Sequence, residues 1–281
     1  MLIRCFRGLF WVLNAVSARL AARVAVAVFY SPRRFPAANW ERTGMASGRL
    51  ERLDFDDESL AATVWGESGP TVLLVHGWQG RQSQLVKIAA RLVESGYRVV
   101  SFDGPAHGSS VKKRTTLVEF SEAVEHAALR FGPVYGIVGH SFGAAAAAIA
   151  IQRGLRTERA VLISCPYSLR HVVSGFARTV GLPAKAHEKM YPLMERLHRC
   201  AEGALSFDEI GPAVRAQCLL IHDSKDQYIP ISDGERVSRS IVGAQFVHTA
   251  GLGHMRILQD EGVVRRVARF LAGGESEAVG A

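Results

Sequence analysis

Short apolar runs alternate with amphipathic stretches along most of the chain. Six runs rich in branched aliphatic residues end near Gly, Pro, Asp or Ser, at positions 71–75, 97–102, 134–138, 160–165, 217–222 and 244–248. Apolar residues recur at helical spacing between them, at positions 83–94, 117–130, 142–153, 233–241 and 261–271. Strands alternating with helices predict an α/β fold, with a mostly parallel central sheet covered by helices on both faces.

A serine stands where one predicted strand turns into a helix. The segment Gly139-His140-Ser141-Phe142-Gly143 follows the run 134–138 and precedes an alanine-rich helix. Packing a strand and a helix so closely leaves no room for side chains beside the turn, which explains glycine at both flanks. This pattern is a nucleophile elbow, and it makes Ser141 a candidate nucleophile. A buried serine in an ordinary turn is the alternative.

Such a serine needs a histidine to remove its proton and a carboxylate to orient that histidine. In folds with this elbow the chain order is serine, acid, histidine. Asp223 and Asp226 both follow the run 217–222, and His254 lies on a glycine-rich stretch after the run 244–248. Both aspartates fit the order, so either one is a candidate at this point. For His254 the alternative is an ordinary histidine of a surface loop.

Four separated motifs then occur in one order. They are His76-Gly77-Trp78, the segment 103–110 that begins with Asp103, the elbow, and the acid and histidine loops. On these motifs the chain resembles the α/β-hydrolase fold superfamily, of the serine hydrolase (esterase or lipase-like) type, over residues 50–272. In that family the acid stands four residues before a proline and the histidine follows a glycine. The resemblance therefore selects Asp226 over Asp223, and His254.

The resemblance also implies a chemistry. It implies a Ser141–Asp226–His254 triad that cleaves a carboxylic ester, a thioester or a lactone through an acyl-enzyme. The backbone N–H groups of Trp78 and Phe142 would form the oxyanion hole. The remaining motif residues would have structural roles: His76, Gly77, Gly139, Gly143 and Asp103. Alternatives are an acyltransferase or perhydrolase with the same triad, or a catalytically silent scaffold that binds a ligand or partner.

Other signals are absent from the sequence. There is no dinucleotide loop, Walker loop or zinc-spaced His/Cys cluster, so we expect no cofactor and no metal. The four cysteines, at positions 5, 165, 200 and 218, have no C-x-x-C spacing and are typical of a reducing compartment. These features favour a cytoplasmic enzyme that acts on a small acyl ester. The substrate and the oligomeric state stay open.

About fifty residues separate the runs 160–165 and 217–222, more than a crossover helix needs. Apolar and charged residues interleave there, which predicts a helical segment at about 168–212. Because family members usually carry their cap at this point, we expect a small lid that supplies the substrate pocket. Packing on the edge of the sheet is the alternative for any single residue of the segment.

The N-terminal segment 1–36 holds six arginines and no acid, and the whole chain has a formal net charge of +8. The rest of the chain is thus nearly neutral, and no nucleic-acid partner is expected. One interpretation is a basic amphipathic helix lying on the anionic inner membrane face, with Phe10, Trp11 and Val12 at the lipid boundary. A helix packed on the hydrolase domain and a cleaved signal peptide are the alternatives. The tail 273–281 is expected to be disordered.

Overall fold

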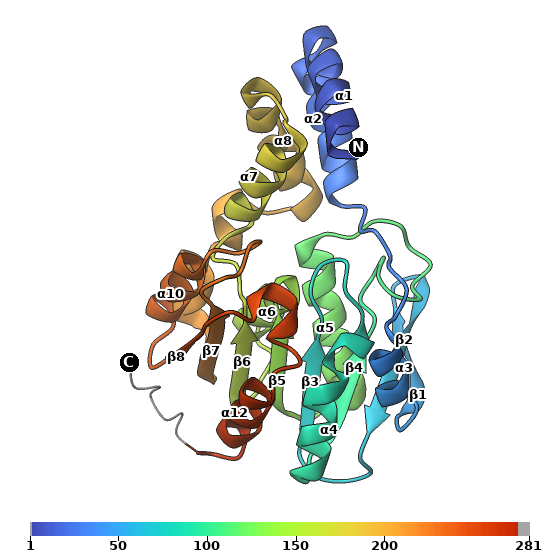
Figure 1. Ribbon diagram of the computed structural model, residues 1–281, viewed down its shortest axis with the longest axis vertical. Helices are drawn as coiled ribbons and strands as arrows, with labels where there is room; N and C mark the ends of the chain where they lie inside the picture. Colours follow the sequence, from blue (N-terminus) through green and yellow to red (C-terminus); the bar gives the residue numbers. More distant parts are fainter. Residues whose placement is uncertain (1, 275–281) are drawn as a thin grey trace.

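A single eight-stranded sheet forms the centre of the protein (Figure 1). The computed structural model describes residues 2–274, except for the side chains of residues 2–6 and 202. In chain order the strands are β1 (Arg49–Phe55), β2 (Glu58–Trp65), β3 (Thr71–Val75), β4 (Arg98–Phe102), β5 (Val134–His140), β6 (Arg159–Ile163), β7 (Gln217–Asp223) and β8 (Gln245–Thr249). Their order across the sheet is β1-β2-β4-β3-β5-β6-β7-β8.

The sheet is mostly parallel, as the sequence predicts. Strands β3 to β8 all pair in parallel, whereas β1 and β2 are antiparallel and were not predicted. Val75 pairs with Gly139, and His140 pairs with Ile163, so the carboxyl ends of β3, β5 and β6 are level. Loops that leave these three strands therefore meet at one edge of the sheet.

Helices cover both faces of the sheet, which confirms the predicted fold class. The helices around the sheet are α3 (Asn39–Met45), α4 (Val86–Glu94), α5 (Leu117–Phe131), α6 (Phe142–Gln152), α10 (Ile231–Ser240), α11 (Gly253–Arg256) and α12 (Glu261–Leu271). Because successive side chains of a strand point to opposite faces, Leu73 and Val75 join the core under α5 and α6, while Val72 and Leu74 join the core under α4 and α12.

Helix α6 is buried along almost its whole length. Ala144 to Ala148 are five consecutive alanines, and none is more than 5% exposed. A helix enclosed by the sheet and by α5 has no outward polar face, and its small side chains allow both neighbours to approach. The start of α6, just after Ser141, is thereby held rigidly at the carboxyl edge of the sheet.

The segment between β6 and β7 is helical, as predicted for residues 168–212. It contains α7 (Leu169–Val180), α8 (Ala184–His198), α9 (Phe207–Ile210) and the short 3₁₀ turns η2 (Glu202–Leu205) and η3 (Gly211–Ala213). Its base is tied to α10, because the buried Asp233 carboxylate accepts a hydrogen bond from the Tyr167 N–H at 2.9 Å and lies 3.0 Å from Nδ1 of His171.

Helices α1 (Leu2–Val16) and α2 (Ala18–Phe29) come before α3 and the sheet. They form a hairpin that projects from the carboxyl edge of the sheet beside α7 and α8 (Figure 1). Helix α2 packs on α8, and its buried Ala21, Ala22 and Ala25 allow the two backbones to come close. Within residues 2–274, no helix is both long enough and apolar enough to cross a bilayer. Most of the predicted disordered tail, residues 275–281, lies outside the described residues.

A buried polar pair joins the hairpin to α8. The Tyr30 hydroxyl, just after α2, lies 2.7 Å from Nε2 of His198 at the end of α8. Burial, with a smaller effect of Cys200, raises the pKa of Tyr30, so its hydroxyl keeps its proton and donates it to His198. Burial lowers the pKa of His198 to about 4, so the imidazole is neutral and accepts. The two groups satisfy each other where water is excluded.

This pair makes the stability of the protein depend on pH. Below the ordinary pKa of 6.5 the unfolded chain protonates His198, whereas the folded chain does so only near pH 4. The contribution of His198 to the free energy of unfolding is therefore complete above pH 6.5 and falls by up to about 1.4 kcal/mol per pH unit on acidification. Urea unfolding at several pH values should give a shallower pH profile for His198→Gln than for wild type. The exposed His248→Gln is the control, and a wild-type slope in His198→Gln would contradict the assignment.

Candidate active site

Ser141 stands at the turn between β5 and α6. Its backbone has φ +52° and ψ −118°, a strained conformation for a residue with a side chain. A Cβ atom on Gly139 would lie 2.5 Å from Cα of Ala144, and one on Gly143 would lie 2.3 Å from the carbonyl oxygen of His76. Both glycines are therefore required by backbone contacts, as the elbow pattern predicts. The turn is held by the Ser141 N–H, which donates to the Ile163 carbonyl at 2.8 Å.

Asp226 and His254 form a direct pair. Oδ2 of Asp226 lies 2.6 Å from Nδ1 of His254, and Oδ1 accepts the N–H groups of Tyr228 and Ile229 at 2.9 Å each. Burial alone would raise the pKa of Asp226, but the hydrogen bond and charge of His254, with the two backbone donors, outweigh it and lower the pKa. The carboxylate therefore stays ionised and holds a proton on Nδ1 of His254.

Asp223 has a different set of partners. Its buried carboxylate accepts hydrogen bonds from the N–H of Lys225 at 2.8 Å, from Oγ1 of Thr249 at 2.7 Å and from the N–H of Leu252 at 3.0 Å. Burial opposes ionisation, yet these donors lower the pKa of Asp223 to about 2. Asp223 therefore ties the acid loop to the histidine loop, and it is Asp226 that faces His254.

His140 connects His254 to the elbow. Its Nε2 lies 2.9 Å from the carbonyl oxygen of His254, and since a carbonyl only accepts, this nitrogen carries the proton. Burial, together with the charge of His254, lowers the pKa of His140 to about 3, so its ring is neutral. The two rings lie 4.7 Å apart, which places His254 against the residue before Ser141. His254 itself lies in the short helix α11, whereas the sequence predicted a loop.

The segment after β3 also lies close to Ser141. A Cβ atom on Gly77 would be 3.1 Å from Cβ of Ser141, so glycine allows this close approach. Within residues 2–274 no acceptor is bonded to the N–H of Trp78, and Phe142 is the first residue of α6, where a helix leaves its N–H groups free. The Trp78 and Phe142 rings are 4.8 Å apart, so the two predicted oxyanion-hole residues are neighbours.

Three other motif residues brace this segment. Nε2 of His76 accepts the Gly104 N–H at 3.0 Å, Nε2 of His107 accepts the Gln79 N–H at 3.0 Å, and Oδ1 of Asp103 accepts the Gln82 N–H at 3.0 Å. Each bond joins the loop after β3 to the loop after β4. Burial lowers the pKa of His76 to about 4 and that of His107 to about 3, so both rings are neutral acceptors.

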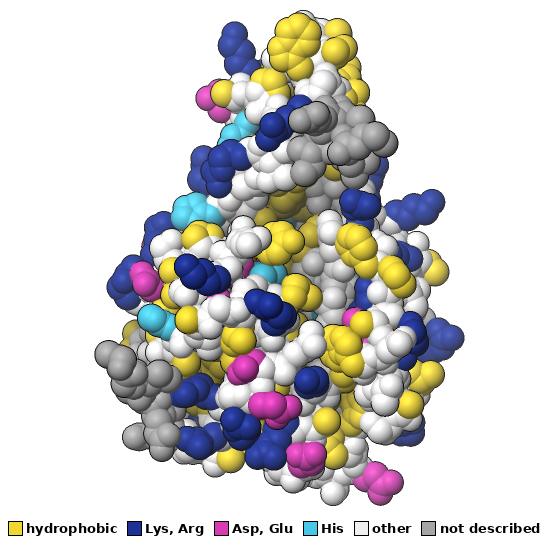
Figure 2. Space-filling view, in the orientation of Figure 1, with side chains coloured by type: hydrophobic (Ala, Val, Ile, Leu, Met, Phe, Trp, Pro, Cys, Tyr) yellow, Lys and Arg dark blue, Asp and Glu magenta, His cyan; other side chains and the backbone are white. Residues whose placement is uncertain are grey.

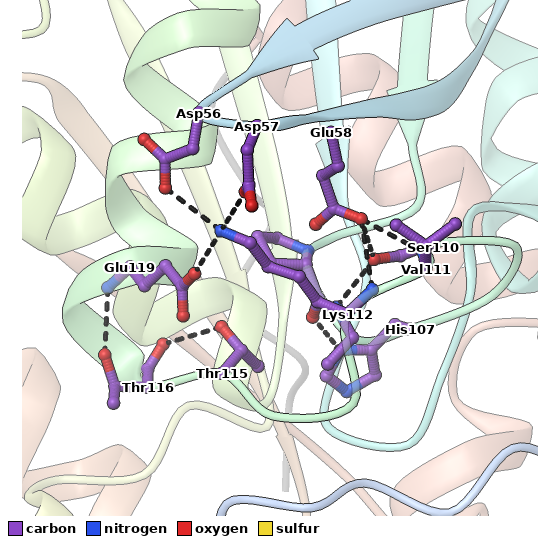
Figure 3. A network of polar contacts seen from close by, with 12 residues as sticks. Asp56, Asp57, Glu58, His107, Ser110, Val111, Lys112, Thr115, Thr116 and Glu119 are labelled. Carbon is purple, nitrogen blue, oxygen red and sulfur yellow. Dashed lines mark hydrogen bonds and ion pairs between the residues drawn. The ribbon is translucent and has the colours of Figure 1, made fainter.

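A polar network holds the loop after β4 in place (Figure 3). The Glu58 carboxylate accepts from the Ser110 hydroxyl at 2.6 Å and from the Val111 N–H at 3.0 Å. Nearby, Lys112 forms ion pairs with Asp56, Asp57 and Glu119 at distances of 3.0 to 3.4 Å. The unpredicted strand β2 thus positions the loop that carries His107.

One part of the site had no sequence signal. Phe29, the last residue of α2, stacks on Trp78 with ring centroids 6.2 Å apart and planes at 18°, and it meets Phe176 of α7 at 5.2 Å. The N-terminal hairpin therefore reaches the loop beside Ser141. Nothing around Phe29 in the sequence indicates a partner fifty residues away.

Comparison with known proteins identifies the family. The sequence profile of the alpha/beta hydrolase family matches residues 72–266, so the chain belongs to this family, as the motif order predicts. No curated protein matches the sequence.

Several solved structures share the fold. A membrane phospholipase A, described as a bacterial virulence factor, has a TM-score of 0.65 at 18% identity and covers 96% of this chain and 98% of its own. An esterase of Pyrococcus furiosus has a TM-score of 0.64 at 20% identity, with coverages of 87% and 97%. A thioesterase domain from the curacin biosynthetic pathway has a TM-score of 0.60 at 19% identity, with coverages of 80% and 99%.

The close approach at the elbow leads to a stability prediction. Gly143→Ala should lower the free energy of unfolding by about 1 to 3 kcal/mol or more, because the new methyl group meets backbone that cannot rotate away. Chemical denaturation measures this change. Gly203→Ala is the matched control, because a Cβ there meets no atom within 4 Å. Equal stability of the two variants would contradict the packing described here.

Proposed function

We propose that this protein is a serine hydrolase that cleaves a carboxylic ester through an acyl-enzyme on Ser141. The observation that carries the proposal is the 2.6 Å bond between Asp226 and Nδ1 of His254, whose ring lies 4.7 Å from the ring of His140, the neighbour of the strained Ser141. A hydrogen-bonded acid and base next to such a serine supply what its hydroxyl lacks as a nucleophile.

In the first half of the reaction, Oγ of Ser141 attacks the carbonyl carbon while Nε2 of His254 takes the hydroxyl proton. The tetrahedral intermediate collapses, His254 gives this proton to the leaving alkoxide, and the acyl group stays on Ser141. Asp226 stays ionised throughout, since its pKa is already lowered, and it stabilises the imidazolium. Water repeats the steps in the second half, which releases the acid and restores the serine.

The negative oxygen of each intermediate needs preorganised donors. The unbonded N–H groups of Trp78 and Phe142 are suited to this role, and one such donor is typically worth about 3 kcal/mol of activation free energy. The contact between the Trp78 and Phe142 rings holds the two backbone segments at a fixed distance from each other.

Apolar side chains beside Phe142 would receive the acyl part of the substrate. They come from α5, α6, α7, η2 and α9 and surround a cavity of only about 10 Å³, so the inserted helices would have to move apart to admit an acyl chain. Leu169 and Val172 belong to the inserted helices, which supports a role of the insertion as a lid that shapes the pocket. The names of the structural neighbours, a phospholipase, an esterase and a thioesterase, agree with an acyl substrate.

An activated serine should react with a fluorophosphonate ester. We expect intact-mass spectrometry to find one phosphonyl adduct on the wild type and none on Ser141→Ala or His254→Ala, because attack needs both the oxygen and the base. His248→Ala is the matched histidine control and should label normally. A folded wild type without an adduct would favour the silent scaffold, and labelling of Ser141→Ala would refute the assignment of the nucleophile.

The two aspartates should separate activity from stability. Asp226→Asn should lower kcat on a soluble aryl ester by about ten-thousandfold, because the amide favours the wrong tautomer of His254. Asp223→Asn should instead lower the free energy of unfolding by about 1 to 3 kcal/mol, since the loops lose a shared acceptor, with a far smaller change in kcat. Steady-state kinetics and urea unfolding of both variants test this. A large loss of kcat in Asp223→Asn, with little loss in Asp226→Asn, would assign the role of catalytic acid to Asp223.

A further inference from the structure

The outward side of the N-terminal hairpin is apolar. On α1, Leu9, Trp11, Val12 and Val16 are 45%, 70%, 55% and 75% exposed, and Leu20 at the start of α2 is 41% exposed. Gly8 and Ala15 are the other exposed residues between positions 8 and 16, so this stretch of α1 shows no charged side chain to solvent. A helix on the surface of a protein in water normally carries polar residues on this side.

Packing inside the protein does not explain these residues. The inner side of α1 already has its own apolar contacts, because Phe10 is fully buried and Leu13 packs on the core. Phe10 is therefore not at a lipid boundary, in contrast to the expectation from sequence. Other exposed apolar residues lie apart from one another along the chain, such as Leu129 on α5 and Val242 in the loop between α10 and β8. In Figure 2, by contrast, hydrophobic side chains gather at the end of the projection.

The N-terminal hairpin also exposes positive charge. Arg7, Arg19 and Arg23 are exposed on the same hairpin, and residues 1–36 contain no acidic side chain to neutralise them. Exposed bulky apolar residues next to unopposed arginines are complementary to one kind of surface, the boundary between acyl chains and acidic headgroups. A partner protein with an apolar groove would not by itself require three arginines without a single acid.

We propose that the α1 apolar face, formed by Leu9, Trp11, Val12, Val16 and Leu20, docks on a lipid bilayer that contains anionic headgroups. The apolar side chains enter the acyl boundary and the arginines lie at the headgroups. Helix α2 stays packed on α8, so docking holds the catalytic domain at the bilayer without unfolding the hairpin. This binding is independent of the chemistry at Ser141.

The full chain should be tested with point variants. Deleting the hairpin would also remove Phe29 and Tyr30, which contact Trp78 and His198. A loss of vesicle binding could then result from misfolding and not from loss of the apolar face. We expect wild type to float with vesicles of phosphatidylcholine and phosphatidylglycerol, and much less with phosphatidylcholine alone. Val12→Glu and Val16→Glu should each lower the partition coefficient at least about tenfold. Val242→Glu, at an exposed valine of the loop between α10 and β8, is the control.

The charge contribution has its own variants. Arg19→Gln and Arg23→Gln should each weaken binding to the anionic vesicles about fivefold. Added salt should also weaken this binding, because it screens the attraction between the arginines and the headgroups. Arg156→Gln, an exposed arginine of the loop between α6 and β6, should bind as wild type does. Trp11 should show a blue-shifted emission on binding that is missing in Trp11→Phe.

Several results would overturn the proposal. Wild type that does not float, or Val12→Glu that floats equally well, would exclude lipid docking by this face. A wild-type dimer in sedimentation velocity that Val12→Glu dissociates, with no flotation of either protein, would assign the face to a second copy of the chain. Fluorophosphonate labelling should be the same in Val12→Glu and wild type, so a failure of docking is distinguishable from a failure of the proposed catalytic site.

Discussion

The absence of two Cβ atoms at the elbow is the constraint on which the rest of the site depends. A Cβ on Gly139 would lie 2.5 Å from the backbone of α6, and a Cβ on Gly143 would lie 2.3 Å from the His76 carbonyl oxygen just after β3. Only this approach lets the chain reverse in one residue and leave Ser141 at the carboxyl edge with a positive φ. It also explains the alanines of α6, since a helix so close to the sheet and to α5 has room only for small side chains.

Around this rigid turn, the buried histidines are neutral and the two aspartates of the acid loop are ionised. His76, His107 and His140 are held neutral by burial and used as hydrogen-bond partners of neighbouring loops. Asp223 and Asp226 are both kept ionised, because donors surround each carboxylate, yet one joins two loops and the other meets His254. The Asp226 carboxylate therefore lies on the Nδ1 side of His254, where it holds a proton on that nitrogen.

The sequence predicts the parts of this structure whose signal is local. Apolar runs, glycine spacing and motif order are enough for the parallel strands, the elbow and the candidate residues. Strand β1 was missed because an edge strand with alternating charges, Arg49–Phe55, resembles a polar loop. Phe29 was missed as a contact of the site because its partner, the Trp78 ring, is distant in sequence and follows only from the fold.

From the sequence, the N-terminal segment could be a helix that lies on a membrane or a helix that packs on the hydrolase domain, but not both. The hairpin explains why both interpretations had support. Small residues are concentrated in α2, where alanines allow a close helix contact but offer little apolar area to any other surface. Bulky residues are concentrated on the outer side of α1, where no helix covers them. Taken as one helix the segment must either pack or expose its apolar side. The segment is instead divided at Ser17, whose hydroxyl accepts the N–H of Leu20 at the start of α2. Because the two helices have different directions, α2 packs its small residues on α8 while α1 exposes its bulky apolar side.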